Sequence, residues 1–420
     1  MIGALADDFT GATDIAAAFR RSGLQVHLVL DPTRASAPAP GTDVVVIGLK
    51  TRTIPAPEAV AASLEALRHL ADVDAEQVFF KYCSTFDSRD EGNIGPVADA
   101  LADAVGAGCA VVVPASPAHG RTQYLGHLFV GDRLLSESPM RDHPLTPMTD
   151  PLIPRVLSRQ TPRTVELADL SVVRDGTLRE RLDAAEQVGT RYLVVDALTE
   201  EDLGTIGAAV RRAPLVTGAA GLAAGLGAAL AADGTRGRPT PSGPTAAPSP
   251  AVRAAALAGS CSARTLEQVD RMCDEHPHHF LDALSQPDPE ALAETALAWY
   301  DAQPEGSTPL IYSSQGPDSL QRTQEVLGTD RASEILEAAT AAIARGLVAR
   351  GVGRLVVAGG ETSGAVATAL GVTDAQVGEE AAPGVPWLRT TAPRPLDLLL
   401  KSGNFGGPDL LLTALHPEER

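Results

Sequence analysis

Two adjacent acids, Asp7 and Asp8, are the first residues of the sequence that could do chemistry. They directly follow an apolar run that predicts a strand over Ile2–Ala6, and they precede Gly11 and a helix predicted over Ile15–Ser22. Open α/β sheets bind ligands beyond the carboxyl ends of their strands. One of the two carboxylates could therefore orient a substrate hydroxyl or take its proton. The alternative interpretation is that both acids only cap the turn and the helix.

Cationic side chains stand at the ends of the next two predicted strands. Arg52 follows a strand predicted over Val44–Leu49, and Lys81 and Ser84 lie at the end of one predicted over Val78–Tyr82. An arginine can grip a carboxylate through two parallel N–H bonds, while Lys81 and Ser84 can bond hydroxyls. Together these side chains suit a small polyhydroxylated carboxylate. Taken singly, each cation is more often a solvated surface charge.

Two more segments of the first half bear on this site. The Pro-rich segment 132–149 is long for a connection, so it either covers the site or packs on the surface. The segment 92–96 opens a helix with a proline in its first turn and is interpreted as a helix cap.

Three turns rich in Gly and Ser follow predicted strands in the second half, at 258–265, 357–365 and 401–407. Main-chain N–H groups and hydroxyls in such turns bind phosphate, and glycines let the main chain come close to it. Glu361 could bind a ribose or help to hold Mg²⁺. None of the turns is a Walker P-loop or a GxGxxG fingerprint. One such turn is weak evidence for phosphate binding, but three in one half are stronger.

The elements that must position these residues predict an α/β protein, with two α/β domains of mainly parallel sheets joined by a Pro/Gly-rich linker. A length of 420 residues also favours two domains. We place the domains at 1–232 and 253–420 and the linker at 233–252. The other predicted strands are Val26–Leu30, Ala110–Pro114, Tyr192–Asp196, Leu215–Thr217, Ala254–Gly259, Leu310–Ser313, Leu355–Ala358, Trp387–Thr390 and Leu398–Lys401, and the clearest helices are Glu58–Leu70, Ile94–Val105, Ala291–Trp299 and Ala332–Arg350.

The composition restricts the partners. The chain has 34 Lys and Arg against 53 Asp and Glu, a formal charge of −19 that repels nucleic acid and anionic lipid. We therefore expect neither a nucleic-acid nor a membrane partner. The four cysteines are far apart and lack zinc-site spacing, and the first residues lack a signal-peptide pattern. Both features favour a cytoplasmic protein with reduced thiols.

Beyond these patterns, the sequence resembles the four-carbon acid sugar kinases, and within that family the 3-oxo-tetronate kinases. The resemblance covers essentially the whole chain, and its motifs keep the same order. The segments that carry it are LADDFTGATD, GLKTR, KYCSTFDSRDEGNIGP, PASPAHGRTQYLGHLFV, SESPMRDHPLTPM, AGSCSARTLEQV, VAGGETSGAV and LKSGNFGG.

The resemblance implies that the N-terminal domain binds the acid sugar and the C-terminal domain binds ATP. It implies acid-sugar contacts at Asp8, Arg52, Lys81, Tyr82, Cys83 and Ser84, and ATP contacts at Ser260, Gly359, Gly360, Glu361, Thr362 and Gly403. These positions agree with the strand ends identified above, which by themselves do not name ATP.

The reaction expected from the resemblance is transfer of the γ-phosphoryl group of ATP, with Mg²⁺, to the C4 hydroxyl of 3-dehydrotetronate. Asp8 is the candidate catalytic group that orients this hydroxyl and takes its proton, with Asp87 as the alternative. Such chemistry asks mainly for positioning and charge neutralisation. Mg²⁺ would be held chiefly by the phosphates and water, and its protein ligands are left unassigned.

Other functions stay open at this point. A threonate or erythronate kinase of the same family is the nearest alternative. An NAD(P)-dependent oxidoreductase would share the two α/β domains, but GxGxxG is missing. A non-catalytic sugar-acid binding protein would normally be exported, and no signal peptide is seen. The sequence allows an oligomer.

Overall fold

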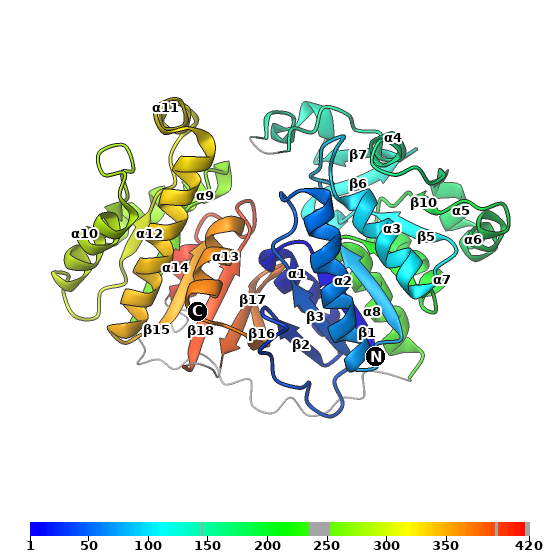
Figure 1. Cartoon of the computed structure of the whole chain (residues 1–420), viewed down its shortest axis with the longest axis horizontal. Coiled ribbons are helices and arrows are strands. Elements are labelled where there is room, and N and C mark those ends of the chain that lie inside the picture. The colour runs from blue at the N-terminus through cyan, green and yellow to red at the C-terminus, as the bar shows by residue number, and fades with distance from the viewer. Residues whose placement is uncertain (144–145, 235–252, 391–393, 416–420) are drawn as a thin grey trace. The chain divides into compact units, whose positions relative to one another are not determined.

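The computed structural model describes residues 1–143, 146–234, 253–390 and 394–415 (Figure 1). The chain divides into two compact units, Met1–Pro241 and Ser242–Arg420. Both units are α/β with mainly parallel sheets, which confirms the predicted fold class. The predicted linker 233–252 lies outside the described residues from 235 onward. No helix in the described part of the chain is long and apolar enough to cross a membrane.

The large sheet of unit 1 is built from parallel strands connected mostly through helices. Its strands are β1 (Ile2–Ala6), β2 (Val26–Val29), β3 (Val44–Gly48), β4 (Gln77–Lys81), β5 (Ala110–Val113), β9 (Val165–Ala168), β10 (Tyr192–Val195) and β11 (Leu215–Gly218). Its helices are α1 (Phe9–Arg21), α2 (Ala56–Asp72), α3 (Ile94–Val105), α4 (Ile153–Ser158), α5 (Leu170–Arg174), α6 (Leu178–Gln187), α7 (Glu200–Val210) and α8 (Ala220–Ala232). The described strands pair in the order β2-β3-β1-β4-β11-β5-β10-β9, and every pair is parallel. All their carboxyl ends therefore lie at one edge.

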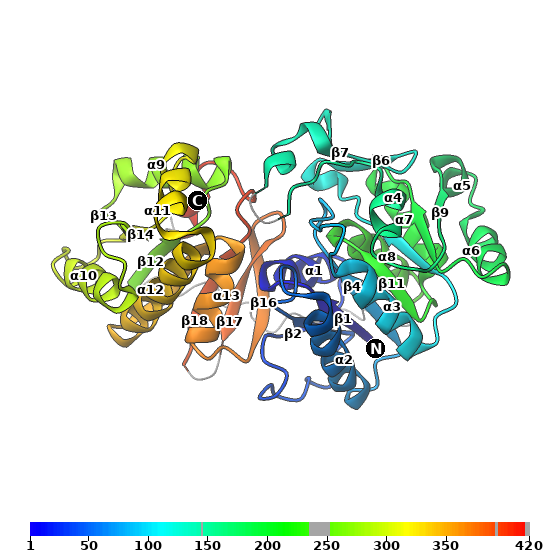
Figure 2. The same ribbon diagram turned by 45° about the horizontal axis from the view of Figure 1, so that its top comes forward.

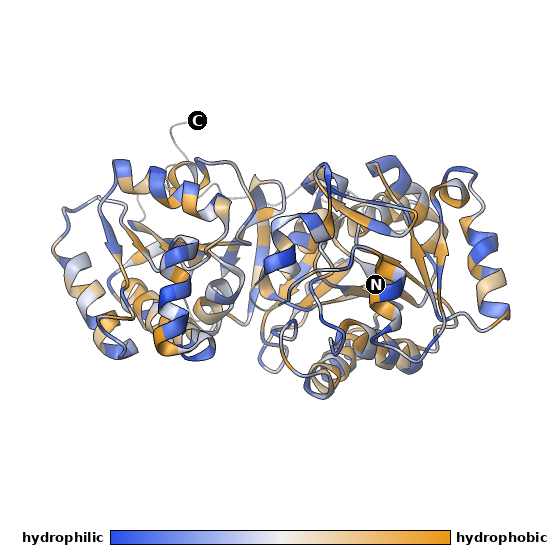
Figure 3. Cartoon of the chain, turned by 90° about the horizontal axis from the view of Figure 1, so that it is seen from above, coloured by the Kyte–Doolittle hydropathy of each residue, from blue (hydrophilic) through white to orange (hydrophobic). Residues whose placement is uncertain are grey.

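Two neighbouring residues of β4 show how this sheet is covered. Phe80 belongs to the core that α2 and α3 build on one face. Phe79 meets Phe19 of α1 edge-on, with ring centroids 5.9 Å apart. Successive side chains of a strand point to opposite faces, so α1 covers the other face, where it packs on α8 and α8 packs on α7. Burial on both faces explains the nearly continuous apolar strand sequences (Figure 3).

A small antiparallel sheet, β6 (Arg121–Tyr124), β7 (His127–Val130) and β8 (Arg133–Leu134), was not predicted from the sequence. The turn between β6 and β7 consists of Leu125 and Gly126, at φ 47° and 75°. Two-residue turns of this kind usually show Asn-Gly or Asp-Gly, so Leu125 hides the hairpin. Gln123 bridges Ala197, the second residue after β10, which places this sheet at the carboxyl edge of the large one (Figure 2).

Unit 2 has a sheet of described strands in the order β13-β14-β12-β15-β18-β17-β16. The strands are β12 (Arg253–Ala258), β13 (His278–Phe280), β14 (Leu310–Tyr312), β15 (Val352–Ala358), β16 (Asp374–Ala382), β17 (Val385–Thr390) and β18 (Leu396–Lys401), and the helices are α9 (Ala263–Glu275), α10 (Pro289–Asp301), α11 (Pro317–Leu327), α12 (Thr329–Ala349), α13 (Gly360–Ala369) and α14 (Leu410–Leu415). All pairs are parallel except β18 with β17 and β17 with β16. Helices α9 and α14 contribute to the core on one face, and α12 and α13 cover the other (Figure 1).

Most predicted elements are present within one or two residues at either end, but the first helix is not. It begins at Phe9 rather than at Ile15. Asp8 is its N-cap, because the side chain accepts the N–H of Gly11 at 2.7 Å. The sequence prediction treated Gly11 as part of a turn, whereas the cap draws it into the first helical turn.

The contact between α7 and α8 gives a test of the packing. A Cβ at Gly207 would lie 2.4 Å from the main chain of Gly225, whereas nothing lies within 4 Å of a Cβ at Gly204 in the same helix. We expect Gly207→Ala to lower the free energy of unfolding by about 1–3 kcal/mol through overpacking. Gly204→Ala should raise it by about 0.5–1 kcal/mol, because alanine favours a helix. Denaturant titrations measure both, and equal effects would contradict the close contact.

Candidate active site

The polar residues of unit 1 gather because three adjacent strands end at the same level. In the order β3-β1-β4, Ala6 pairs with Gly48 on one side and with Lys81 on the other. Asp7 and Asp8 therefore continue from the middle strand, with the segment carrying Arg52 on one side of them and Lys81 on the other. We call Asp7, Asp8, Arg52 and Lys81 the carboxylate–cation cluster.

Arg52 bridges the two acids of this cluster. Its Nε and Nη2 donate to the two oxygens of Asp7 at 2.8 and 2.7 Å, and Nη2 also donates to Asp8 at 2.7 Å. The main-chain N–H groups of Thr51 and Arg52 donate to the carbonyl of Asp7 at 2.9 and 3.2 Å. The fork that the sequence assigned to a substrate carboxylate is thus occupied by Asp7. A bound carboxylate would meet Nη1 or compete with the acids.

Asp8 is both a helix cap and a charged member of the cluster. Besides the N–H of Gly11, its carboxylate accepts the hydroxyl of Thr10 at 2.7 Å. Burial opposes ionisation of Asp8. The charges of Arg52 and Lys81 and these hydrogen bonds outweigh it, so the pKa of Asp8 lies below its ordinary value. Asp8 is therefore ionised at neutral pH, and a carboxylate of low pKa orients a hydroxyl better than it removes a proton.

Lys81 is almost completely buried, at 4% exposure, and its ammonium donates to the carbonyl of Tyr82 at 3.1 Å. Gly11 leaves room for it: a Cβ there would lie 2.6 Å from Nζ of Lys81 and 2.3 Å from the carboxylate of Asp8. The glycine of the first helical turn is thus what allows Asp8 and Lys81 to sit side by side.

Of the residues that follow β4, some are buried in the core and others lie at the site. The side chain of Tyr82 is fully buried, and its hydroxyl lies 3.1 Å from that of Thr217, so only its main chain reaches the cluster. The thiol of Cys83 contacts the hydroxyl of Thr85 at 3.0 Å, and burial with the nearby Asp87 raises the pKa of Cys83 to about 11. Ser84 is partly exposed. A contact of Tyr82 with substrate through its ring is therefore not supported.

Asn93 is a site residue whose role differs from the predicted helix cap. As the residue before α3 it makes no side-chain cap hydrogen bond. Its amide instead donates to the carbonyls of Thr51 and Ile54 at 2.6 and 3.0 Å. The capping interpretation of the segment 92–96 is wrong at this residue, because Asn93 holds the loop that carries Arg52. The two segments are about forty residues apart in the sequence, so no local pattern reveals their contact.

Two residues of the Pro-rich segment 132–149, His143 and Met148, lie near the residues that follow β4 or near Arg52. The N–H of Ser88 donates to the sulfur of Met148 at 3.5 Å. His143 is desolvated, which lowers its pKa, while the nearby Asp87 raises it and Arg52 lowers it further. Its Nδ1 accepts the N–H of Thr146 at 3.1 Å, so the neutral ring carries its proton on Nε2. Of the two readings left open by the sequence, the structure therefore favours a cover over the site.

Unit 2 repeats the arrangement of three adjacent strand ends. In the order β12-β15-β18, Ala358 pairs with Ala258 and with Lys401. The three Gly- and Ser-rich turns therefore meet at one edge. We call the residues that meet there the glycine-loop cluster: Ser260, Ser262, Thr265, Gly359, Gly360, Glu361, Thr362, Lys401 and Gly403.

Three glycines make this meeting possible. A Cβ at Gly259 would lie 2.2 Å from the hydroxyl of Thr362, and a Cβ at Gly403 would lie 2.3 Å from that of Ser260. Gly359 adopts φ 129°, which strongly favours glycine. Helices α9 and α13 begin at the same edge, so their first N–H groups and these hydroxyls together form the kind of surface that binds phosphate.

Glu361 is exposed in the first turn of α13. Among the described residues, no group of three or more His, Cys, Asp or Glu side chains could hold a metal ion.

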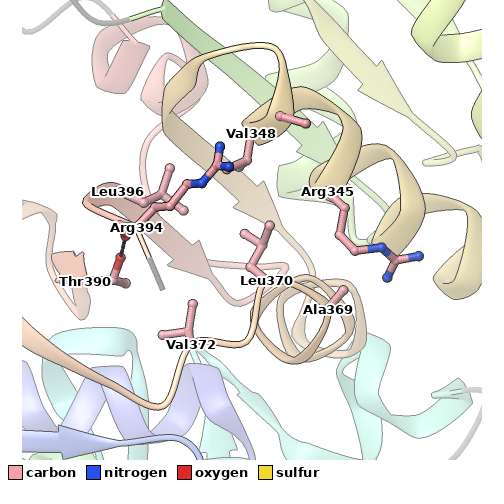
Figure 4. Close-up of a pocket in the computed structure, with 9 residues that line it drawn as sticks. Arg345, Val348, Ala369, Leu370, Val372, Thr390, Arg394 and Leu396 are labelled. Atoms are coloured by element: carbon pink, nitrogen blue, oxygen red, sulfur yellow. Dashed lines mark hydrogen bonds between the residues drawn. The ribbon is translucent and has the colours of Figure 1, made fainter. Parts of the chain in front are cut away.

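A cavity of about 200 Å³ lies elsewhere in unit 2 (Figure 4). Its wall includes Leu370 after α13 and Leu396 at the start of β18, so it lies at the amino edge of this strand, away from the glycine-loop cluster. The other lining residues are Arg345, Val348, Ala349, Ala369, Val372, Thr390 and Arg394.

Comparison with known families agrees with this division of the polar residues. A model described as a sugar-binding N-terminal domain matches residues 2–226, and one described as a nucleotide-binding C-terminal domain matches residues 255–411. The carboxylate–cation cluster lies in the first range and the glycine-loop cluster in the second. The chain thus belongs to a class of two-domain proteins with one sugar-binding and one nucleotide-binding domain.

Curated relatives define the family more closely. The 3-oxo-tetronate kinase of Cupriavidus necator is 45% identical and aligns over 99% of this chain and 96% of its own length. That of Methylobacterium radiotolerans is 46% identical over 99% and 98%. A crystal structure from Salmonella typhimurium LT2, provisionally described as a tRNA synthase, is 41% identical with a TM-score of 0.84 and covers 99% of both chains. The chain belongs to the family of the 3-oxo-tetronate kinases.

Asn93 provides a test of the site geometry. Asp caps helices as well as Asn does, so Asn93→Asp would be harmless if the residue were only a cap. If Asn93 instead holds the Arg52 loop, the substitution places a carboxylate against the carbonyls of Thr51 and Ile54. We then expect the free energy of unfolding to fall by about 1–3 kcal/mol, and the KM for the acid sugar to rise. Thermal melts and steady-state kinetics measure both, and a variant like wild type in both would refute the loop-holding role.

Proposed function

We propose that the protein is a kinase that transfers the γ-phosphoryl group of ATP to the C4 hydroxyl of a 3-oxo-tetronate, giving the 4-phosphate and ADP. The observation that carries this proposal is the 41–46% identity, over 96–99% of the chain, to curated proteins named 3-oxo-tetronate kinase. The four cysteines are free thiols, and we place the reaction in the cytoplasm.

In this proposal, the carboxylate–cation cluster binds the acid sugar. Lys81 and the exposed side of Arg52 attract its carboxylate, and the ionised oxygens of Asp8 accept hydrogen bonds from its hydroxyls. Ser84 and the main chain around Cys83 complete the pocket. His143, which lies near Asp87 and Arg52 and carries its proton on Nε2, offers a further hydrogen-bond donor. The acids and cations of the cluster balance in number, so recognition depends on geometry more than on net charge.

The glycine-loop cluster binds ATP in this proposal, through the first N–H groups of α9 and α13, the hydroxyls of Ser260 and Thr362, and the main chain at Gly359, Gly360 and Gly403. Mg²⁺ on the phosphates would neutralise the charge of the transferred group. Glu361 is the carboxylate that would hold a water of the Mg²⁺ shell or the ribose of ATP. These assignments fit phosphoryl transfer, which needs positioning and charge neutralisation.

Asp8 has an orienting role in this mechanism. Its low pKa makes it a weak base, but a hydroxyl that donates to it points its oxygen lone pair toward the phosphorus. Loose phosphoryl-transfer transition states need little proton removal before the new bond forms. Asp87, which accepts the hydroxyl of Thr85, is the alternative acceptor of the proton.

A substrate panel with ADP detection tests the function. We expect ADP release with a 3-dehydrotetronate and at least tenfold lower kcat/KM with threonate and erythronate, because one missing hydrogen-bond match can separate such substrates. Preference for threonate or erythronate would select the alternative kinase within the family. Absorbance change with NAD(P)⁺ and no ADP release would point to an oxidoreductase, and saturable binding without either would point to a binding protein.

Asp8→Asn tests the orienting role. Asn keeps the cap but loses the charge, so we expect kcat to fall by about 10- to 100-fold, toward the lower end of losses typical of a general base. The low pKa also predicts no fall in wild-type kcat/KM caused by Asp8 between pH 8 and pH 5. Asp43→Asn is the control, because Asp43 accepts the N–H of Gln25 at 2.9 Å just before β3, at the opposite edge of the sheet. Wild-type turnover in Asp8→Asn would remove Asp8 from the mechanism.

A further inference from the structure

Lysine is rare in this chain, and its three positions have something in common. Of the 34 Lys and Arg residues, only Lys50, Lys81 and Lys401 are lysines. Lys81 and Lys401 end β4 and β18, and Lys50 comes two residues after β3, so all three stand at carboxyl ends of parallel strands. Lys50 is exposed. The other two are buried where the two clusters lie, and Lys401 has no role so far.

Lys401 is fully buried, at 0% exposure. Its Nζ donates to the hydroxyl of Thr265 at 2.9 Å and to the carbonyl of Gly403 at 3.0 Å. Thr265 in turn donates to the same carbonyl at 2.8 Å. The main-chain carbonyl of Lys401 accepts the N–H of Gly359 at 2.9 Å. One residue thereby fixes all three turns of the glycine-loop cluster relative to one another.

In the described part of the unit, no carboxylate forms an ion pair with Lys401. Among the described residues, no carboxylate lies within 4.0 Å of its Nζ, and both of its acceptors are neutral. The one charged side chain that influences its ionisation is Arg264 on α9, which is also positive; α13 and β15 add no other charge to it. A buried ammonium without a counter-ion is costly. A phosphate bound at this edge, which is made of N–H groups and hydroxyls, would supply the opposite charge.

We propose that Lys401 is a positioning residue for nucleotide binding, which ties the Gly403 turn to the first turn of α9 and supplies the buried positive charge that the phosphates neutralise. This inference rests on the proposed function, because it assigns the anion as the phosphates of the nucleotide. Direct contact is not required, since the charge acts over several ångströms in a site of low dielectric.

The same arrangement makes nucleotide binding depend on the protonation of Lys401. Burial, with a contribution from Arg264, lowers the pKa of Lys401 to about 7 in the free protein. Phosphates nearby favour the charged form and raise this pKa. The affinity for the nucleotide that the charge of Lys401 contributes is therefore fully present below pH 7. It is lost as the pH rises from 7 toward the higher pKa that Lys401 has in the complex. At pH 8, where ADP is fully ionised, binding takes up protons.

Binding of ADP to the full-length protein, measured by calorimetry in buffers of different ionisation enthalpy, tests this on wild type. We expect proton uptake at pH 8 and a Kd that rises between pH 7 and pH 9. Binding without proton uptake and with a constant Kd would overturn the role of Lys401. No ADP binding at any pH would overturn the proposed function itself, so the two failures are distinguishable.

Lys401→Met keeps much of the volume and removes the charge and the donors. We expect it to raise the Kd for ADP about 10- to 100-fold, abolish the proton uptake, and raise the KM for ATP while leaving that for the acid sugar unchanged. Arg354→Met is the matched control, because Arg354 is a buried cation, 2% exposed, at the other end of the β15–β18 pair. It should lower thermal stability and leave the Kd for ADP as in wild type. Equal weakening by both variants would reduce Lys401 to a structural role.

Discussion

In each unit, three adjacent parallel strands end at the same level, and nearly every polar residue of interest depends on that fact. Parallel pairing in register puts the residues after β3, β1 and β4 side by side, although the ends of β3 and β4 lie about 42 and 75 positions from the end of β1 in the sequence. The same constraint joins the turns after β12, β15 and β18. The order of the strands also determines which turn lies between the other two. In unit 1 it is the acidic turn, so each acid has a cation beside it.

The consequence for unit 1 is a cluster whose charges are largely satisfied before any ligand binds. Two nearly buried carboxylates next to each other would repel, and Arg52 removes this cost by donating to both. Lys81 and the N–H of Gly11 complete the compensation around Asp8. An anionic ligand that bound here would meet carboxylates as well as cations. In a chain of charge −19, the few cations of this cluster are thus held in place by neighbouring acids.

The sequence predicted most strands of the two large sheets and the strand ends where both clusters lie, because hydrophobic runs and Gly-rich turns are local signals, but it missed β9, β13 and β16. It failed where the deciding contact is not local. The role of Asn93 depends on carbonyls some forty residues away. The direction of the Tyr82 side chain depends on how the main chain continues after β4. The hairpin at Leu125 lacks the usual turn residues, and the start of α1 at Phe9 depends on the cap formed by Asp8. The burial of Lys401 follows only from the contact of three turns.

The choice of cation at each position follows from what surrounds it. Arg52 has to reach two carboxylates at once, and its planar fork presents Nε and Nη2 to one acid and Nη2 to the next. Lys81 and Lys401 occupy spaces bounded by main-chain carbonyls and small side chains, where a guanidinium would leave several donors without partners. A lysine there needs only two or three acceptors, and at Lys401 burial lowers the pKa of the ammonium. In a chain whose other cations are all arginines, the two buried lysines therefore stand at strand ends bounded by main-chain carbonyls, whereas Lys50 is exposed.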